Sequence, residues 1–478
     1  MSPPPFEVRA LIEGFYGVYY THPERLSLLR FLGRHDYNLY VYAPKNDRQH
    51  RSRWREPYPE RQMEQFSEAR ACAAESGLEF CYALSPGVDS VYASESDFES
   101  ITAKLAQFLQ LGVTSFSLLL DDIRREFSDA RDAESYPSFA AAQADLCNRV
   151  HAWLRRQDDR CRLSMCPTDY HGRPPFSPAL HELGTCLHPD IDVFYTGVDV
   201  CSPTVTRSEV DAFAAALARK PILWDNYPVN DLEMHGELHI GPVRGRSADL
   251  AEALRGFAVN PMIQPEASRV ALATFADYFR DPVRYDAESS WDRALSELAG
   301  EHHQQLRLVA ENSLQSCLGT PEAERLERLT GAAADALMGE RATDPAADQA
   351  ADPAADQIAE LTAYLRELDE ACYSLRYRMA NLELRNELLP WLEQLERWSW
   401  LGRWSVEVLQ PAAGRRSPAA RTTATAATAL ASSPDSATLR RIEEYIQLVD
   451  NHPKRIGGTS LRRLAELAVE RFETAAVA

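Results

Sequence analysis

Two adjacent carboxylates, Asp121 and Asp122, follow an apolar run that begins at Phe116. A pair of carboxylates can supply both an acid and a base to one substrate, as in glycoside hydrolysis. Aspartate is also favoured at the start of a helix, so the pair by itself would more often be structural. However, the first aspartate would lie at the end of a buried strand, where a polar group needs a partner or a substrate. The surrounding residues therefore decide between the two interpretations.

Seven further apolar runs are present, and nearly all of them also end in a residue able to bind or react. Short runs that alternate with segments of helical period are typical of βα units and a parallel sheet. Eight units predict an α/β fold of the TIM (β/α)8 barrel type, with the active site at the carboxyl ends of the strands. The eight runs are 8–14, 38–45, 79–86, 116–122, 162–170, 192–197, 221–226 and 257–260, and their ends carry Gly14, Lys45, Asp121, Asp122, Tyr170, Asn226 and Asn260.

The charge and the hydropathy of the chain exclude several classes of partner. The 478 residues carry a formal net charge of −20, which repels the phosphate backbone of nucleic acids. No apolar stretch approaches the roughly 18 residues needed to span a bilayer. The first residues, Met-Ser-Pro-Pro-Pro, lack the features of a signal peptide. We therefore expect a cytoplasmic protein that binds neither nucleic acid nor membrane.

The nine cysteines have no spacing typical of disulfides or metal sites, and we expect free thiols in a reducing compartment. His181, Cys186 and His188 could in principle bind zinc, but no fourth ligand follows at a useful spacing. The sequence therefore predicts no metal site and no cofactor.

The composition changes after Glu288 to leucine, alanine, glutamate and arginine at helical spacing. We predict a catalytic barrel over residues 1–285 and an all-α helical bundle domain over residues 286–478. Low-complexity insertions near 341–357 and 411–437 are predicted to be loops or linkers, because neither can bury a core. The helical domain would brace the barrel, form a homodimer contact, or both. Four tryptophans are expected mainly in the bundle core: Trp391, Trp398, Trp400 and Trp404.

Side chains suited to binding a sugar follow several of the predicted strands. Carboxylates with amide, lysine and aromatic neighbours are typical of glycosidases. The motifs at the strand ends resemble, in order, those of family 84 glycoside hydrolases, the O-GlcNAcases. They are Glu13-Gly14-Phe15-Tyr16-Gly17, Tyr42-Ala43-Pro44-Lys45-Asn46-Asp47, Ser85-Pro86-Gly87, Leu120-Asp121-Asp122-Ile123, Cys166-Pro167-Thr168-Asp169-Tyr170, Tyr195-Thr196-Gly197, Trp224-Asp225-Asn226, Asn230-Asp231 and Asn260-Pro261.

The resemblance implies a retaining exo-β-N-acetylglucosaminidase that removes O-linked GlcNAc. Its nucleophile would be the substrate's own acetamido oxygen, which forms an oxazoline. Asp121 would orient the acetamido group, and Asp122 would act as general acid and base. The implied partners are N-acetylglucosaminides, including glycosylated proteins or peptides. The implied binding residues are Tyr170 and Asn226 for the acetamido group, Cys166, Tyr195 and Trp224 for its methyl group, Gly14 and Lys45 for the 3-hydroxyl, and Asp231 and Asn260 for the 4- and 6-hydroxyls.

Other interpretations stay open at this point. Lys45 could pair with Asp47 or with a carboxylate in the barrel mouth, and the aromatic and amide side chains could simply pack or cap. The protein could be a catalytically silent GlcNAc-binding or scaffold protein, or a β-hexosaminidase acting on cell-wall or other glycan fragments. Residues 18–20, Asn46 and residues 227–229 depart from the family pattern, which puts the aglycone preference in question more than the reaction.

Overall fold

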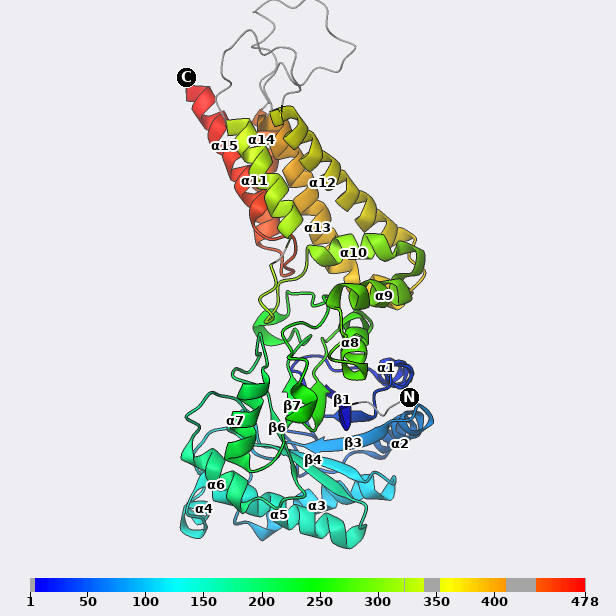
Figure 1. Cartoon of the computed structure of the whole chain (residues 1–478), viewed down its shortest axis with the longest axis vertical. Coiled ribbons are helices and arrows are strands. Elements are labelled where there is room, and N and C mark those ends of the chain that lie inside the picture. Colours follow the sequence, from blue (N-terminus) through cyan, green and yellow to red (C-terminus); the bar gives the residue numbers. More distant parts are fainter. Residues whose placement is uncertain (1–4, 322, 339–352, 410–435, 478) are drawn as a thin grey trace, which may run out of the picture. The chain divides into compact units, whose positions relative to one another are not determined.

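The computed structural model of the chain describes residues 5–321, 323–338, 353–409 and 436–477 (Figure 1). Eight parallel strands form a closed barrel in chain order, and β1 pairs with β8 to complete it. Each strand overlaps one of the predicted apolar runs, so the predicted TIM barrel is confirmed. The strands are β1 (Val8–Glu13), β2 (Leu39–Tyr42), β3 (Glu79–Leu84), β4 (Ser115–Leu119), β5 (Arg162–Cys166), β6 (Asp192–Tyr195), β7 (Ile222–Asp225) and β8 (Gly256–Val259).

The interior of the barrel is packed with small and apolar side chains. They come from alternate positions of the strands, because successive side chains of a strand point to opposite faces. The barrel therefore encloses a core, and polar side chains gather where the strands end. The core cluster consists of Ala10, Ile12, Val41, Ala43, Cys81, Ala83, Leu119, Cys166, Phe194, Ile222, Trp224 and Ala258.

Helices α1 to α8 follow the strands and cover the outside of the barrel (Figure 1). Several begin at a serine or threonine whose hydroxyl accepts a backbone N–H of the first turn, as at Ser94 and Ser138. These helices are α1 (His22–Arg34), α2 (Glu60–Glu75), α3 (Glu95–Gln110), α4 (Ala130–Ser135), α5 (Phe139–Gln157), α6 (Pro178–Cys186), α7 (Arg207–Leu217) and α8 (Pro265–Arg280), with 3-10 turns η1 (Leu232–Met234) and η2 (Leu250–Glu252).

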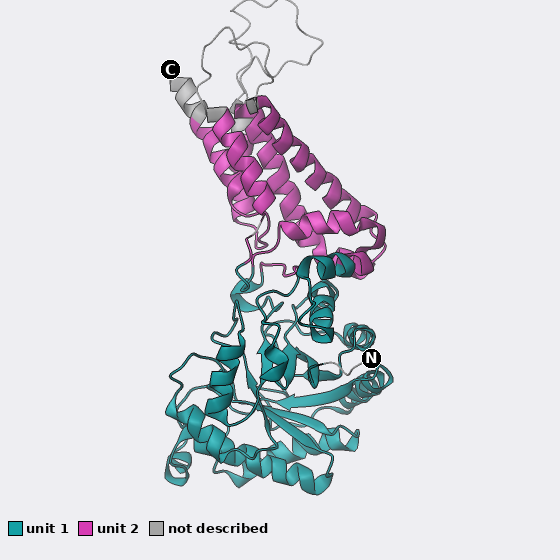
Figure 2. Cartoon of the chain, viewed as in Figure 1, with its two compact units in different colours: residues 1–235, 242–294, 316–319 teal, residues 236–241, 295–315, 320–478 magenta. Residues whose placement is uncertain are grey.

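The chain forms two compact units (Figure 2). Unit 1 holds the barrel and comprises residues 1–235, 242–294 and 316–319; unit 2 comprises residues 236–241, 295–315 and 320–478. Two short stretches therefore belong to a different unit from the residues on either side of them. The sequence predicted one boundary, at residue 285, and a single boundary does not describe these two exchanged stretches.

Unit 2 is helical. Within it, α13 packs against α12 and α15. Trp391 is buried and donates its indole N–H to the Gly236 carbonyl at 2.8 Å, Trp398 is buried, and Trp400 is 38% exposed. The tryptophan cluster thus contributes in part to the bundle interior. The helices after the barrel are α9 (Ala287–Ala299), which begins in unit 1, η3 (Gly300–His302), α10 (His303–Glu311), α11 (Glu324–Met338), α12 (Pro353–Tyr377), α13 (Leu382–Leu409), α14 (Ser436–Asp450) and α15 (Ser460–Val477).

Most of the two predicted low-complexity insertions, residues 341–352 and 411–435, lie outside the described residues. Residues 353–357, expected in a loop, instead begin α12, and residues 436–437 begin α14. Alanine has the highest helix propensity and proline is favoured at the first helical position, which explains a helix that starts at Pro353. Within the described parts of the chain, no helix combines the length and apolarity that crossing a bilayer requires.

Candidate active site

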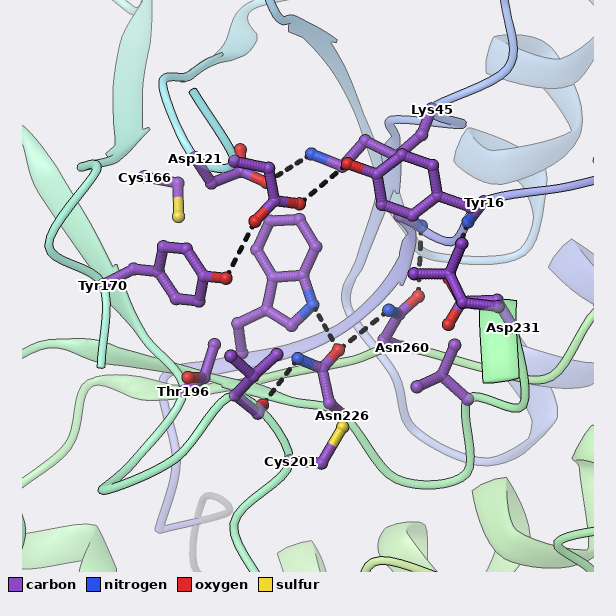
Figure 3. A pocket seen from close by; sticks show the side chains of 16 residues that line it. Tyr16, Lys45, Asp121, Cys166, Tyr170, Thr196, Cys201, Asn226, Asp231 and Asn260 are labelled. Carbon is purple, nitrogen blue, oxygen red and sulfur yellow. Dashed lines mark hydrogen bonds and ion pairs between the residues drawn. The ribbon is translucent and has the colours of Figure 1, made fainter. Parts of the chain in front are cut away.

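A pocket of about 330 Å³ lies at the carboxyl ends of the strands (Figure 3). This volume falls within the range of small-molecule sites. Ten of the eleven site residues expected from the sequence line it, and Tyr195 is the exception. The lining residues are Gly14, Tyr16, Lys45, Asp121, Asp122, Cys166, Tyr170, Thr196, Val200, Cys201, Trp224, Asn226, Val229, Asp231, Leu232 and Asn260.

The two adjacent aspartates both enter this pocket because the backbone turns between them. Successive side chains of an extended chain point to opposite sides, so a straight continuation of β4 would turn one of them away. Asp122 instead has a φ of 53°, in the left-handed region that aspartate tolerates better than most residues with a Cβ atom. Asp121 is 5% exposed, whereas Asp122 is exposed. The turn therefore presents one buried and one accessible carboxylate.

Asp121 is held on one oxygen only. Its Oδ2 lies 2.5 Å from Nζ of Lys45, and both side chains are nearly buried. Its Oδ1 is buried and has no hydrogen-bond partner among the residues the structure describes. Buried carboxylate oxygens normally have donors, so this oxygen is an acceptor without its donor. Of the alternatives for Lys45, the structure shows the ion pair with a carboxylate in the barrel mouth.

Asp122 accepts hydrogen bonds on both oxygens. The Tyr170 hydroxyl donates to Oδ1 at 2.9 Å, and the Tyr16 hydroxyl donates to Oδ2 at 2.8 Å. Desolvation raises the pKa of each tyrosine, and the negative charge of Asp122 adds to this effect. Both hydroxyls therefore keep their protons at neutral pH. Arg51 donates to the backbone carbonyl of Asp122 at 3.2 Å, which supports the turn.

A network of amide groups forms another wall of the pocket. The Asn226 side-chain oxygen accepts from the Trp224 indole at 3.0 Å and from the Asn260 amide at 2.9 Å. The Asn260 oxygen in turn accepts from the backbone N–H of Gly14 at 3.2 Å. A Cβ atom at Gly14 would lie 2.5 Å from the Trp224 ring, so this close approach requires glycine. The network fixes the ends of β1, β7 and β8 against one another.

Asp231 and Cys166 complete the polar and apolar parts of the lining. Asp231 accepts the backbone N–H of Tyr16 at 2.7 Å, and desolvation raises the pKa of its carboxyl group. Cys166 is buried, and desolvation together with the charge of Asp121 raises the pKa of its thiol. The thiol therefore stays neutral and acts as a small apolar surface.

Tyr195 lies behind the pocket wall. Its ring stacks on Phe213 of α7, with the ring centroids 3.8 Å apart, and its hydroxyl donates to the Gly172 carbonyl at 3.2 Å. The next residue, Thr196, lines the pocket instead. The alternation of side chains along a strand explains why adjacent residues face opposite ways. The expectation that Tyr195 lines the pocket does not agree with this placement.

Sequence reasoning also missed several lining residues. Tyr16 belongs to the motif around Gly14, at the end of a predicted strand, and this position could have identified it as a pocket residue. Val200 and Cys201 lie in the loop after β6, Val229 lies in the loop after β7, and Leu232 begins η1; no hydropathy pattern marks which of these side chains turns inward. Leu232 lines the pocket although it is 62% exposed, and it therefore forms an apolar edge of the pocket. Its φ is 50°, in the left-handed region.

The chain is similar in sequence to known glycosidases. A family model described as beta-N-acetylglucosaminidase matches residues 9–311. Protein O-GlcNAcase from Rattus norvegicus and that from Mus musculus are each 35% identical to the chain over 293 residues, 59% of this chain and 31% of each relative. The chain therefore spans about a third of the length of these curated relatives.

Solved structures are similar over nearly the whole chain. A mutant of the Thermobaculum terrenum O-GlcNAc hydrolase superposes with a TM-score of 0.88 at 31% identity, covering 99% of this chain and 97% of the other. CpGH84B superposes with a TM-score of 0.81 at 27% identity, covering 97% of this chain and 77% of the other. Because the family model matches more than half of the chain, the resemblance in the motifs is confirmed. The chain belongs to the beta-N-acetylglucosaminidase family of glycoside hydrolases.

Proposed function

We propose that the chain is an exo-acting enzyme that removes β-linked N-acetylglucosamine with retention, through an oxazoline formed by the substrate's acetamido group. The observation that supports this most is Asp121 Oδ1, a buried acceptor without a donor among the described residues. An acetamido N–H directed at this oxygen would supply the donor that it lacks. Lys45 on the other oxygen holds the Asp121 carboxylate in a fixed orientation.

The acetamido group would lie between Asp121 and Tyr170. Asp121 accepts its N–H and stabilises the positive charge that develops on nitrogen as the carbonyl oxygen attacks the anomeric carbon. Tyr170, which donates to Asp122 in the structure, turns its hydroxyl to the acetamido oxygen and holds it in line. Trp224 and Cys166 surround the methyl group with apolar surface.

Asp122 would serve as general acid and then as general base. In the first step it gives a proton to the glycosidic oxygen as the bond to the anomeric carbon breaks. In the second it takes a proton from the water that opens the oxazoline, which regenerates the acetamido group. When Tyr170 turns to the substrate, the Tyr16 hydroxyl still donates to Asp122 and holds the carboxyl group in place. Its exposure leaves room for the leaving group.

The remaining polar residues would bind the sugar hydroxyls. Lys45 and the Gly14 backbone carbonyl take the 3-hydroxyl, Asp231 and Asn260 the 4- and 6-hydroxyls, and Asn226 supports the acetamido end. A pocket of about 330 Å³ is near the lower limit for ligand sites, which favours binding of a single terminal sugar.

The natural substrate we propose is GlcNAc linked to serine or threonine of proteins or peptides. The names of the relatives support this choice. Two departures from the family pattern neighbour lining residues along the chain: Val18, which is 82% exposed, follows Tyr16 by two positions, and Asn46 directly follows Lys45 and accepts the backbone N–H of Gly17 at 3.2 Å. We expect them to affect the aglycone preference. A cytoplasmic location and a homodimer formed through the helical domain stay predictions.

The decisive experiment compares a fluorogenic β-N-acetylglucosaminide with its N-trifluoroacetyl analogue. Fluorination weakens the acetamido oxygen as a nucleophile, so we expect a marked fall in kcat, and the matching β-glucoside should not be hydrolysed. Turnover that is insensitive to fluorination would retain a β-hexosaminidase but exclude the oxazoline. Tight binding of an oxazoline mimic without turnover of any substrate would favour the catalytically silent alternative.

A further inference from the structure

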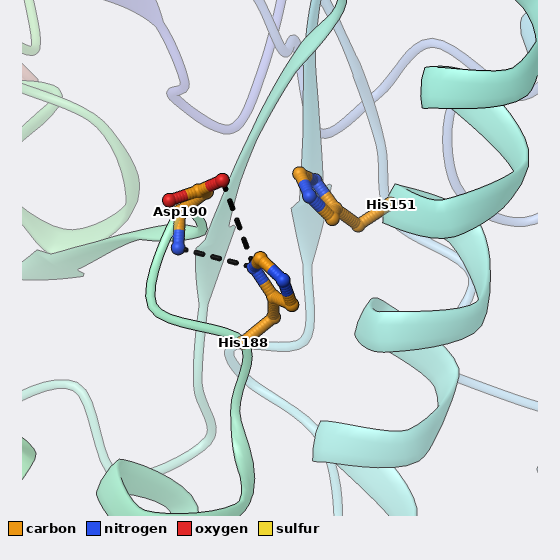
Figure 4. Close-up of side chains that lie close together, drawn as sticks. All are labelled: His151, His188 and Asp190. Carbon is orange, nitrogen blue, oxygen red and sulfur yellow. Dashed lines mark hydrogen bonds and ion pairs between the residues drawn. The ribbon is translucent and has the colours of Figure 1, made fainter.

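Three side chains with metal-binding atoms lie together outside the pocket (Figure 4). His151 belongs to α5, and His188 and Asp190 belong to the loop between α6 and β6. Their ligand atoms all lie within 4.8 Å of one another. This loop leads into the amino end of β6, whereas the pocket lies at the carboxyl ends of the strands. The cluster is therefore separate from the candidate active site.

His151 contributes a buried ring with an unused nitrogen. Its side chain belongs to a residue that is 7% exposed, and its Nδ1 is buried without a hydrogen-bond partner in the described part of the chain. Buried imidazole nitrogens normally have a partner, so this one needs an explanation. A neutral imidazole can use such a lone pair to bind a metal ion.

His188 and Asp190 add two further ligand atoms. Nδ1 of His188 accepts the backbone N–H of Asp190 at 3.2 Å, so an ion bound to His188 would either displace that N–H from Nδ1 or bind Nε2. Oδ2 of Asp190 lies 4.0 Å from the same Nδ1. The centroids of the His151 and His188 rings are 4.6 Å apart, so both imidazoles border the same small volume.

We propose that His151, His188 and Asp190 bind one divalent transition-metal ion of the zinc type, with water completing the coordination. Two imidazoles and a carboxylate are ligands that Zn²⁺ favours, and three protein ligands leave a position for water. Tetrahedral bonds of about 2.0–2.1 Å place ligand atoms roughly 3.3 Å apart, so the exposed Asp190 carboxylate must rotate inward by up to about 1.5 Å. Because the cluster lies before the amino end of β6 and the pocket lies at the carboxyl ends of the strands, we assign the ion a structural role, which is to link the loop to α5.

The backbone of the loop is already held in place for such an ion. Oδ1 of Asn148, on α5, accepts the backbone N–H of His188 at 2.7 Å, and Nδ2 donates to the Cys186 carbonyl at 2.9 Å. Arg219 donates to the His188 carbonyl at 2.8 Å. Because these bonds fix the loop on both sides of His188, binding requires rotation of side chains and little rearrangement of the backbone.

The test uses the full chain after treatment with EDTA and dialysis, titrated with Zn²⁺ by isothermal calorimetry and followed by thermal unfolding. We expect saturation at one ion per chain and a rise in Tm. His188→Ala and Asp190→Ala replace exposed side chains and should lose or weaken this binding, and His151→Ala should lose it. Co²⁺ in place of Zn²⁺ should give the visible absorption of a tetrahedral site in the wild-type chain and not in His188→Ala.

The matched control is His181→Ala combined with Cys186→Ser, which removes exposed potential ligands of the same region that lie outside the cluster. This variant should bind Zn²⁺ like the wild-type chain, and near-ultraviolet circular dichroism should show every variant to be folded. The proposal is wrong if the stripped chain binds no stoichiometric Zn²⁺, if folded His188→Ala binds it unchanged, or if the control variant loses it. None of these readouts depends on hydrolytic activity.

Discussion

At the scale of single residues, Asp121 and Asp122 should respond differently to truncation. Asp122→Ala removes the proposed proton donor, so kcat should fall about 10²–10⁴-fold on glycosides with poor leaving groups and much less on those with good ones. Asp121→Ala removes the acetamido acceptor and leaves Lys45 buried without its carboxylate, so every substrate should react slowly. The measurement is kcat/KM across aryl glycosides of graded leaving-group pKa. Equal losses across the series for both variants would contradict this division of roles.

Tyr16 is a positioning residue that the sequence did not single out. Tyr16→Phe keeps the ring and removes one donor to Asp122, and a hydrogen bond to a charged group is worth about 1.5–3 kcal/mol. We expect kcat to fall about 10-fold or more and KM to change less, because the hydroxyl that is removed donates to the proposed acid. Tyr19→Phe, outside the pocket lining, is the control. An unchanged kcat in Tyr16→Phe would show that this hydrogen bond does not orient Asp122 in the reaction.

The site was largely predictable because the barrel brings strand ends together, and most of the expected residues stood at strand ends. Tyr195 shows the limit of this reasoning, since a shift of one position turns a side chain from the pocket to the helix layer. Cys201 and Val229 show another limit, because loop backbones follow no fixed period. The left-handed turn at Asp122 also has no signal in an Asp-Asp pair.

At the scale of elements, the loop after β2 is tied to β3 by His50. Its Nδ1 lies 2.8 Å from the Ala83 carbonyl oxygen, and its own carbonyl accepts the Ser85 N–H at 3.0 Å. Burial lowers the pKa of His50 to about 3. In the unfolded chain, where a histidine has a pKa near 6.5, this imidazole binds a proton below about pH 6.5. In the folded chain it stays neutral down to about pH 3. The free energy of unfolding should therefore fall by about 1.4 kcal/mol per pH unit as the pH decreases between these values.

His50→Gln should therefore flatten the pH dependence of the free energy of unfolding between about pH 6.5 and 4. Urea unfolding at several pH values measures this, and the exposed His181→Gln serves as the control. The variant should be less stable than the wild-type chain at pH 7 and approach it at lower pH. Parallel curves for the wild-type chain and His50→Gln would contradict the assignment.

The end of β7 depends on a buried ion pair. Arg246 Nη2 lies 2.6 Å from Oδ1 of Asp225, and both side chains are at most 2% exposed. Removing one partner leaves an uncompensated buried charge, so Arg246→Ala should lower the free energy of unfolding by about 3–5 kcal/mol. The exposed pair of Arg284 and Asp281 is the comparison, and Arg284→Ala should change stability by less than about 1 kcal/mol. Chemical unfolding of both variants tests the contrast.

The strands were predictable because a parallel sheet that is buried on both faces produces short, continuous apolar runs, as in β4 and β8. The start of α12 was not. Residues 353–357 combine low complexity, which suggested a loop, with alanine, which favours a helix, and composition alone does not reveal the neighbours that decide between the two.

At the scale of the whole molecule, the two compact units do not follow chain order. Residues 286–294 belong to the barrel unit, where the Ser290 hydroxyl and the Arg293 guanidinium both bind the Asp277 carboxylate. A chain that ends after residue 294 should therefore unfold at a temperature several degrees higher than one that ends after residue 285, since about 1 kcal/mol shifts Tm by roughly 2–4 °C in a domain of this size. Thermal unfolding of both chains measures the difference.

The control is the chain ending at residue 294 with Ser290→Ala and Arg293→Ala, which should behave like the shorter chain. Equal Tm values for the two unsubstituted chains would restore the boundary expected from composition. A change of composition near residue 288 could not reveal the exchanged segments, because membership of a unit is decided by contacts between distant parts of the chain.

The pairing of β1 with β8 also determines when the protein can mature during synthesis. At about 5–20 residues per second, a ribosome needs roughly 10–50 s to add the residues between these strands. Throughout that interval the nascent barrel has unpaired edges, which are sites for association with other chains. Gly14 and Asn260 hydrogen-bond only after β8 has joined β1. The time at which hydrolytic activity first appears in a translation reaction should therefore report the time at which β8 pairs with β1 and the barrel closes.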